Sequence, residues 1–436
     1  MNPVIGIRRE DKNEWEKRVP LVPEDVATLI LNNNFDVIVQ PSEIRVFPND
    51  RYLKQGAKIQ EDLSACSVVF GVKEIPLTLF HPGTAYIFFA HVIKGQKYNM
   101  PMLKRMMELK CHLIDYEKVT DQKGRRLIVF GWHAGAAGMI DSLWAFGQRL
   151  DWEETPNPFH DVKHAYRYSD FKDAENHLAQ VGKRIETDGV PPGHNPLIVG
   201  FAGYGNASRG AQDVFDYLPH IEVEPAQLQK LMKNGPANSK VLYKVVFKEE
   251  HIVKPISAKH RFELQDYYEH PEKYRSRFDD YLPYITILIN TNYWDGRYPK
   301  LVTKASVKEL FSQASKPRLR VIGDISCDVE GSIECNTHIT DPGDPVYVYN
   351  PFTGKSKNGI DGVGPVILAV DNLPCEIPAE SSRYFSNTLM SFVPAIAGAD
   401  YSVPFDQCHL PPEIKDAVIL YQGQLTPRYK YIEKYL

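Results

Sequence analysis

Three residues with chemically useful side chains each follow directly on a short apolar run of β type: Lys73, His91 and Glu117. Buried runs separated by helix-length spacers are typical of parallel strands. Ligands of open α/β sheets bind in the crevice outside the carboxyl ends of such strands. We therefore expect an amine, an imidazole and a carboxylate to meet at one edge of a sheet, which is the layout of an active site.

Lys73 and His91 suit proton transfer near neutral pH. An unperturbed histidine titrates near about pH 6.5, and burial or a nearby cation moves a lysine pKa down toward that range. Taken alone, a histidine after an apolar strand is more often a hydrogen-bonded core residue, and a lysine at a strand end is usually solvated. Their joint placement on adjacent strand ends favours catalysis.

A glycine-rich turn after the apolar run that begins at Pro196 is a second candidate site. Between a strand and a helix start, such a turn binds a dinucleotide pyrophosphate through backbone N–H groups and the positive end of the helix dipole. Ser208 replaces the third glycine of the pattern, and Gly210 follows it. Glu224 lies about 20 residues beyond the turn, where an acid is expected to accept a ribose 2′-hydroxyl. The alternative for the glycines is a tight turn in a domain that binds no cofactor. The alternative for Glu224 is an ordinary surface carboxylate. The expected cofactor contacts are Gly203, Tyr204, Gly205, Asn206, Ala207, Ser208 and Glu224.

The elements that must position these residues follow an α/β pattern. A strand is predicted at 3–7, a helix at 22–33 and a strand at 35–40, before the three strands that carry the polar residues. Residues 133–150 are predicted to be helical, with small side chains that permit either close helix packing or a hinge. A polar and aromatic stretch at 151–195 is predicted to bridge two architectures.

The second part of the chain adds further strand candidates. They lie at 220–223, 284–289, 319–323 and 366–370, and the tail from Pro378 is predicted to be helical and irregular. We therefore expect an α/β fold of two Rossmann-like domains with a cleft between them. The predicted division is a discontinuous substrate and catalytic domain at 1–135 plus 378–436, and a dinucleotide-binding domain at 136–377.

Composition excludes several classes of function. The 436 residues are 43% hydrophobic and 24% charged, with a net charge of −4 and no block of lysine or arginine, so neither nucleic acid nor a membrane surface is an expected partner. The six cysteines are scattered without zinc-site spacing, and no metal site is predicted. No apolar stretch reaches membrane-spanning length. The sequence begins directly with a strand, and we expect a cytoplasmic protein.

Ordered motifs along nearly the whole sequence resemble a known family. They include Phe-Gly-Val-Lys73-Glu, Phe-Ala-His91-Val-Ile-Lys-Gly-Gln, Ile-Asp-Tyr-Glu117 and Asp324-Ile-Ser-x-Asp328. The chain resembles the lysine–ketoglutarate reductase half of the bifunctional aminoadipic semialdehyde synthases. It is similar, more distantly, to fungal lysine-forming saccharopine dehydrogenase and to alanine dehydrogenase.

The resemblance implies a reaction in which the ε-amine of L-lysine condenses with 2-oxoglutarate and a nicotinamide reduces the imine to saccharopine, or the reverse. It implies Lys73 and His91 as the acid–base pair. It implies that Arg18 binds substrate carboxylates, and that Glu16, Glu117 and Arg125 surround the dicarboxylate and the lysine amine. Gln96, just past His91, is a supporting candidate.

Asp324 and Asp328 match a motif that closes the site in alanine dehydrogenase. Either carboxylate could pair with Lys73, and we favour Asp328 for the substrate side. An acidic pair four residues apart could equally cap a loop or a helix.

The cofactor evidence conflicts, because Glu224 disfavours a 2′-phosphate whereas the bifunctional relatives use NADPH. We favour NADP(H) over NAD(H).

The sequence ends at Leu436, where the bifunctional family continues into a second enzyme. We therefore expect a chain that makes saccharopine, with a separate glutamate-forming saccharopine dehydrogenase as a partner; a homo-oligomer is compatible with the sequence. The alternatives are an alanine dehydrogenase-like oxidoreductase on another amino acid and a non-catalytic regulator that binds nucleotide or amino acid.

Overall fold

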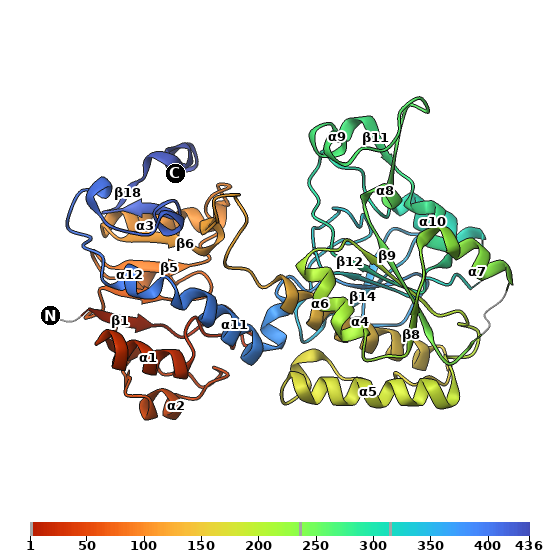
Figure 1. Cartoon of the computed structure of the whole chain (residues 1–436), viewed down its shortest axis with the longest axis horizontal. Helices are drawn as coiled ribbons and strands as arrows, with labels where there is room; N and C mark the ends of the chain where they lie inside the picture. The colour runs from red at the N-terminus through yellow and green to blue at the C-terminus, as the bar shows by residue number, and fades with distance from the viewer. Residues whose placement is uncertain (1–2, 235–237, 314–315) are drawn as a thin grey trace. The chain divides into compact units, whose positions relative to one another are not determined.

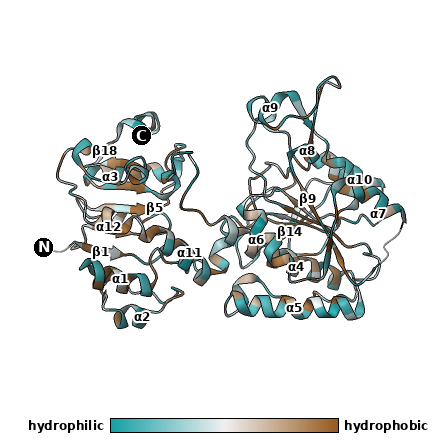
Figure 2. Cartoon of the chain, in the orientation of Figure 1, coloured by the Kyte–Doolittle hydropathy of each residue, from teal (hydrophilic) through white to brown (hydrophobic). Residues whose placement is uncertain are grey.

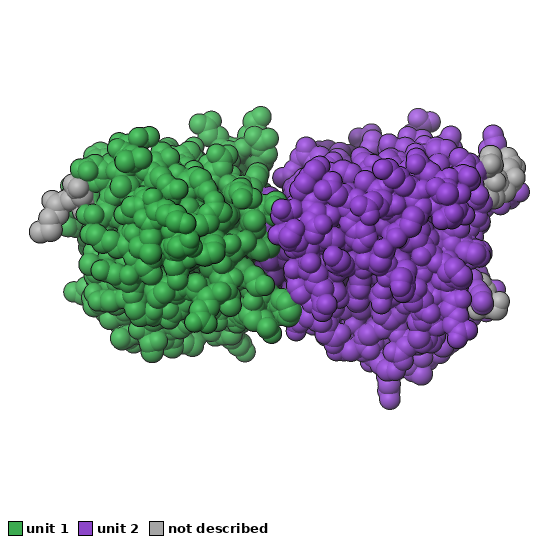
Figure 3. All heavy atoms as spheres, turned by 90° about the horizontal axis from the view of Figure 1, so that it is seen from below, with its two compact units in different colours: residues 1–130, 378–436 green, residues 131–377 purple. Residues whose placement is uncertain are grey.

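The chain folds into two compact units, shown in Figures 1 and 3. The computed structural model describes residues 3–234, 238–313 and 316–436. The first unit comprises 1–130 and 378–436, and the second comprises 131–377. The boundary predicted at 135/136 falls inside a helix, α4 (Gly131–Trp152), which belongs wholly to the second unit.

An eight-stranded sheet forms the centre of the first unit, in the order β18-β17-β6-β5-β4-β1-β2-β3. Its strands are β1 (Val4–Ile7), β2 (Asp36–Val39), β3 (Lys58–Ile59), β4 (Val68–Phe70), β5 (Ala85–Phe88), β6 (His112–Asp115), β17 (Val418–Tyr421) and β18 (Gln424–Leu425). The six strands from β6 to β3 are parallel, and β17 joins β6 in antiparallel pairing. The prediction of a helical and irregular tail was wrong for β17 and β18.

The helices of the first unit lie on the two faces of this sheet (Figure 1). They are α1 (Pro23–Asn33), α2 (Asn49–Lys54), α3 (Met100–Glu108), α11 (Pro378–Met390), α12 (Val393–Ala397) and α13 (Pro412–Lys415). Helix α11 ties the returning tail to the N-terminal segment. The Ser382 and Ser386 hydroxyls accept hydrogen bonds from the backbone N–H groups of Val19 and Val22, each at 3.0 Å. These bonds hold the segment that directly follows Arg18.

A second eight-stranded sheet forms the centre of the second unit, in the order β15-β14-β16-β13-β12-β7-β9-β8. Its strands are β7 (Ile198–Ala202), β8 (His220–Glu222), β9 (Leu242–Phe247), β12 (Ile287–Asn290), β13 (Val321–Asp324), β14 (Val346–Tyr349), β15 (Ser356–Asn358) and β16 (Val366–Leu368). The strands from β16 to β8 are parallel, and β14 and β15 are antiparallel additions. A separate hairpin joins β10 (Val253–Pro255) to β11 (Tyr274–Ser276).

Helices cover both faces of the second sheet, each face with its own apolar core. Besides α4 they are α5 (Phe171–Asp188), α6 (Asn206–Phe215), α7 (Leu228–Asn234), α8 (Glu249–Ile252), α9 (Leu264–Glu269) and α10 (Lys304–Gln313). Residues 151–195 were predicted to bridge two architectures. This prediction was wrong, because the stretch lies wholly inside the second unit and contains α5. The Asp170 carboxylate caps α5 by accepting from the N–H of Asp173 at 2.8 Å. Figure 2 shows hydrophobic colour on the strands and hydrophilic colour on outer surfaces such as that of α5.

The small residues of α4 allow it to pack against α6 at very short range. A Cβ atom on Gly135 would lie 1.8 Å from the Ala207 carbonyl oxygen, and one on Gly210 would lie 1.9 Å from that of Trp132. No larger side chain fits at these two positions without moving the backbone. Close helix packing, one of the roles predicted for the small residues, is therefore what they provide within the second unit.

Candidate active site and nucleotide-binding loop

The three predicted polar strand ends of the first unit lie side by side. Strands β4, β5 and β6 are neighbours in parallel register, so Lys73, His91 and Glu117 follow their carboxyl ends at the same edge of the sheet. Strand β1 is the next neighbour and leads to Glu10 at this edge. The structure thus groups an amine, an imidazole and carboxylates on one rim.

Glu74 is the immediate partner of His91. The Glu74 Oε1 atom lies 2.7 Å from His91 Nδ1, and its Oε2 atom lies 3.2 Å from the Lys12 ammonium. Burial acts to raise the pKa of Glu74, but the hydrogen bond and charge of His91, with Lys12, outweigh burial and hold that pKa at about 2. Glu74 therefore stays ionised and orients the imidazole ring. No sequence pattern singled out Glu74, although it directly follows Lys73.

Lys73 occupies an environment that favours its neutral amine. Burial lowers its pKa, and the positive charge of Arg18 lowers it further. Within the described part of the chain, its ammonium makes no ion pair or hydrogen bond. A hydrogen bond fixes the backbone of Lys73, since its N–H donates to Glu10 Oε2 at 2.9 Å. A lowered pKa makes this amine a better proton donor and acceptor for catalysis than an exposed lysine.

Arg18 and Glu16 form a buried bidentate pair. Arg18 Nε lies 2.7 Å from Glu16 Oε1, and Nη2 lies 2.6 Å from Oε2. The residues are 3% and 1% exposed, and the guanidinium lies over the Phe130 ring at 4.5 Å. The planar fork of the guanidinium is thereby fixed in position next to Lys73.

Glu117 pairs with Arg126, not with Arg125. The Arg126 guanidinium contacts the Glu117 carboxylate, whereas Arg125 is 75% exposed and pairs with Asp121 at 2.7 Å. The Asp115 carboxylate accepts from the N–H of Glu117 at 2.9 Å and so holds this turn. The substrate role predicted for Arg125 stays a prediction, and Arg126, which was not selected from the sequence, is the residue that contacts Glu117.

Gln96 has a local structural contact after His91. Its side-chain oxygen accepts from the N–H of Lys94 at 3.1 Å and closes the turn that leads into the next helix. This turn keeps the loop after β5 compact around His91, whose own backbone φ is +49°.

The glycine loop of the second unit has the geometry of an anion cradle. Gly203 has φ of +100°, and a Cβ atom there would meet Thr291 Oγ1 at 2.8 Å. Gly205 precedes the first turn of α6 without a side-chain cap, and a Cβ atom there would enter open space. Asn206 and Ala207 start the helix, so backbone N–H groups face that space. These residues fit a dinucleotide pyrophosphate.

Of the other three predicted cofactor residues, Tyr204 lies within the glycine turn, and Ser208 and Glu224 are engaged elsewhere. Ser208 is fully buried on α6, and its hydroxyl accepts from Gln212 Nε2 at 2.9 Å. Glu224 follows β8, which among the described strands pairs with β9 and not with β7. The Glu224 backbone begins a short helix turn at 225–227, where its N–H donates to Gln227 Oε1 at 2.8 Å. The structure therefore does not place Glu224 on the strand beside the glycine loop.

Asp324 and Asp328 differ strongly in exposure. Asp324 ends β13 at 1% exposure and accepts from Asn290 Nδ2 at 2.9 Å and from Asn336 Nδ2 at 2.8 Å. Burial raises its pKa. Asp328 is exposed on the loop that follows. Asp324 is thus engaged inside the second unit, and Asp328 is the one of the pair that faces solvent.

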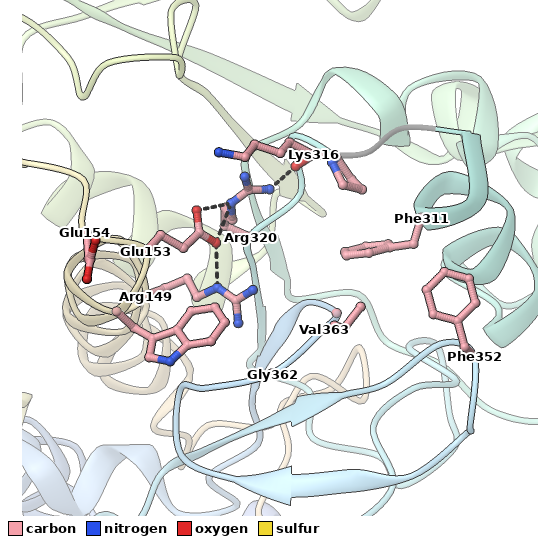
Figure 4. A pocket seen from close by; sticks show the side chains of 12 residues that line it. Arg149, Glu153, Glu154, Phe311, Lys316, Arg320, Phe352, Gly362 and Val363 are labelled. Atoms are coloured by element: carbon pink, nitrogen blue, oxygen red, sulfur yellow. Dashed lines mark hydrogen bonds and ion pairs between the residues drawn. The ribbon is translucent and has the colours of Figure 1, made fainter.

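A cavity of about 510 Å³ lies at the opposite end of the second sheet (Figure 4). It is lined by residues that precede β13 and β16 and by the end of α4. The Glu153 carboxylate pairs with two guanidinium groups, that of Arg149 at 2.8 Å and that of Arg320 at 3.1 Å. Arg149 also donates to the Ile360 carbonyl. These bonds tie α4 to the start of β13, so the charged groups serve the fold at an edge remote from the glycine loop.

Among the described residues, no three His, Cys, Asp or Glu side chains are grouped so as to hold a metal ion. Within the same residues, no helix combines the length and apolar character needed to cross a membrane.

The chain belongs to the alanine dehydrogenase/PNT family. The N-terminal domain of that family matches residues 6–137, and its C-terminal domain matches residues 199–428. Among solved structures, an L-alanine dehydrogenase has a TM-score of 0.62 with 17% sequence identity, over 99% of both chains. These matches confirm the predicted superfamily and the two-domain α/β fold.

Among curated proteins, the alpha-aminoadipic semialdehyde synthase of Arabidopsis thaliana is 36% identical over 99% of this chain and 41% of its own length. A saccharopine dehydrogenase [NAD(+), L-lysine-forming] of Emericella nidulans is 27% identical over 88% of this chain and 90% of its own length. The chain thus spans less than half the length of the synthase and nearly the whole of the dehydrogenase. Both similarities agree with the predicted family resemblance.

Proposed function

We propose that the chain is an oxidoreductase that condenses L-lysine with 2-oxoglutarate and reduces the imine to saccharopine, or catalyses the reverse. The observation that carries the proposal is the similarity over 99% of the chain to a protein named alpha-aminoadipic semialdehyde synthase. The second similarity, to a saccharopine dehydrogenase named as lysine-forming, agrees with it. The cluster of Lys73, His91 and Glu74 supplies the proton-transfer groups that this chemistry needs.

The proposed roles follow from charge and position. When bound at the glycine loop, a pyridine nucleotide supplies hydride to the imine carbon. Lys73, with its lowered pKa, takes the proton that leaves the attacking amine. His91, oriented by Glu74, donates a proton to the oxygen that leaves as water. Two groups are useful here because condensation and dehydration move protons in opposite senses.

The substrates carry several carboxylates and one reacting amine. Arg18, held in place by Glu16, is proposed to attract a carboxylate of the 2-oxoglutarate part through its positive charge. Arg126 is proposed for a second carboxylate, and Glu117 for an ammonium group of lysine. Asp328, as the exposed member of its pair, is proposed for the substrate side.

The test is oxidation of NADH and NADPH in parallel, with either 2-oxoglutarate or pyruvate as the keto acid and a panel of lysine, ornithine and ammonia as the amines. The proposal expects turnover only when lysine and 2-oxoglutarate are both present. Turnover with ammonia and pyruvate but none with lysine would assign the chain to an alanine dehydrogenase type of reaction. Nucleotide binding without any turnover would favour a regulator.

A glutamate-forming saccharopine dehydrogenase is proposed as the enzyme that consumes the product. Adding one to the assay should yield further nicotinamide turnover from the saccharopine formed. No such turnover, with lysine-dependent oxidation intact, would show that the product is a different compound.

A further inference from the structure

The cavity of Figure 4 contains two buried arginines that share one carboxylate. Arg149 is 5% exposed and Arg320 is 7% exposed. Their Nε atoms lie 2.8 Å and 3.1 Å from the same oxygen, Glu153 Oε1. Burial acts to raise the pKa of Glu153, but the bonds and charges of the two arginines hold that pKa below its usual value, so the carboxylate is ionised. Two positive charges against one negative charge leave one positive charge uncompensated.

The other charged residues that line the cavity do not supply the missing negative charge. Burial lowers the pKa of Arg320, and the charge of Arg149 adds to this effect against the opposing charge of Glu153. Glu154 is exposed and, among the described residues, forms no ion pair with either arginine. Lys316 adds a further positive charge. Because a buried charge is unfavourable unless it is paired, the cavity favours an anion.

Each guanidinium group also keeps hydrogen-bond donors that no protein group uses. Arg149 donates through Nε to Glu153 and through Nη1 to the Ile360 carbonyl. Arg320 donates through Nε to Glu153 and through Nη1 to the Pro317 carbonyl. Within the described part of the chain, neither Nη2 atom has an acceptor. These donors border one cavity, and guanidinium donors of this kind bind carboxylates.

The rest of the lining is largely apolar and aromatic. Figure 4 shows Phe311 and Phe352 on the side of the cavity away from Arg149. Phe352 and Val363 are 50% and 53% exposed, and the Arg149 guanidinium lies over the Trp152 ring at 4.6 Å. Exposed apolar side chains around a cavity are typical of a ligand site. The volume of about 510 Å³ lies within the usual range for small molecules, about 300–1,000 Å³.

We propose that this cavity binds a small aromatic carboxylate, whose oxygens accept from the Nη2 groups of Arg149 and Arg320. The carboxylate supplies the missing negative charge, and the ring packs against Phe311 and Phe352. The cavity lies where β13 and β16 begin, whereas the glycine loop follows the end of β7 in the same parallel array. The ligand therefore binds apart from the nucleotide loop, and the proposal does not depend on the proposed function.

The experiment is isothermal titration of the full chain with 1-naphthoate, an aromatic carboxylate. Wild type should bind one molecule per chain with a dissociation constant of about 1 mM or lower, as expected for a ligand of this size. Two related compounds test the two parts of the ligand, since 1-naphthalenemethanol lacks the charge and acetate lacks the rings. Each should bind at least about tenfold more weakly than 1-naphthoate.

Substitutions outside the buried group of charges locate the site without disturbing it. Val363→Asp places a carboxylate at the exposed side of the cavity, where it repels an anionic ligand, and should weaken 1-naphthoate binding at least about tenfold. Val329→Asp is the matched control, because Val329 is 51% exposed and does not line the cavity. Its affinity should stay within about twofold of wild type. Phe352→Ala removes a ring from the lining and should weaken binding about threefold or more.

Several results would overturn the proposal. They are no binding of 1-naphthoate by wild type, equal affinity for the neutral alcohol, and equal affinities in Val363→Asp and Val329→Asp. Light scattering tests whether another protein chain covers this face instead. An oligomer that dissociates in Val363→Asp, together with no 1-naphthoate binding by wild type, would make the face a contact between chains and would also overturn the proposal. Lysine-dependent turnover enters none of these outcomes, so this proposal and the proposed function fail separately.

Discussion

Glu10 is the buried carboxylate on which the position of Lys73 depends. It is 5% exposed, and its two oxygens accept from the N–H groups of Val72 at 2.7 Å and Lys73 at 2.9 Å. Glu10→Gln keeps the shape of this side chain but replaces one acceptor with an amide donor. One backbone N–H then faces another donor, which costs about 1–3 kcal/mol. We expect the loop to shift and kcat to fall by about 10–100-fold, because small misplacements of catalytic groups cost that much.

The pH dependence of the free energy of unfolding provides a second quantity that can be measured on the same variant. Burial raises the pKa of Glu10 from 4.5 to about 7. The folded state therefore holds this proton more tightly than the unfolded state between these values, and stability falls as the pH rises through that window. An interval of about 2.5 pH units at 1.36 kcal/mol each gives about 3 kcal/mol. Glutamine does not titrate. The stability of Glu10→Gln relative to wild type should therefore increase by about this amount between pH 4.5 and 8.

The assay is thermal unfolding of both proteins across this pH range, with steady-state kinetics at one pH. At roughly 2–4 °C per kcal/mol for a unit of this size, the difference in Tm should move by about 6–12 °C. Glu14→Gln, which neutralises an exposed carboxylate of the same segment, is the control and should show no such movement. A Tm difference that stays constant with pH, together with wild-type kcat in Glu10→Gln, would refute both parts of the reasoning.

Three further predictions concern the proposed sites. Lys73→Met and His91→Gln should each lower kcat by about 10²–10⁴, with the NADH dissociation constant unchanged in calorimetry; a wild-type kcat in either would remove its role. Arg126→Met should raise the KM for 2-oxoglutarate or lysine about tenfold or more, whereas Arg125→Met, at an exposed residue, should change it by less than about twofold. A larger effect on KM in Arg125→Met than in Arg126→Met would restore the sequence-based choice of Arg125. Gly205→Val should weaken NADH binding at least about 100-fold, since its side chain would enter the space next to the backbone donors, while circular dichroism shows a folded chain; unchanged affinity would place the dinucleotide elsewhere.

The strands that carry the candidate site were predictable because their sequence signal is local. Buried parallel strands consist of short apolar runs, and the polar residue after each run marks the end of the strand. For this reason β4, β5 and β6 could be found, and with them Lys73, His91 and Glu117. Their pairing as neighbours also follows a simple tendency, since successive strands of such sheets usually lie side by side.

Partners of these residues were harder to predict, because they depend on which way side chains point. Glu74 and Arg126 each stand beside a residue that was chosen, Lys73 and Arg125 respectively. Adjacent residues differ in direction once the backbone turns, and no periodic pattern operates within a loop. The contacts of His91 with Glu74 and of Glu117 with Arg126 therefore became visible only with the loops in place.

The expectation for Glu224 shows a different limit, which lies in the order of strands. A rule based on distance along the sequence assumes that the strand after the glycine loop also lies next to it in the sheet. Here β9 is inserted between β7 and β8, so that assumption fails. Hydrogen bonding between strands depends on the whole chain and leaves little trace in a short window of sequence. The segment beside the glycine loop is then the one that follows β9, and the role predicted for Glu224 stays a prediction.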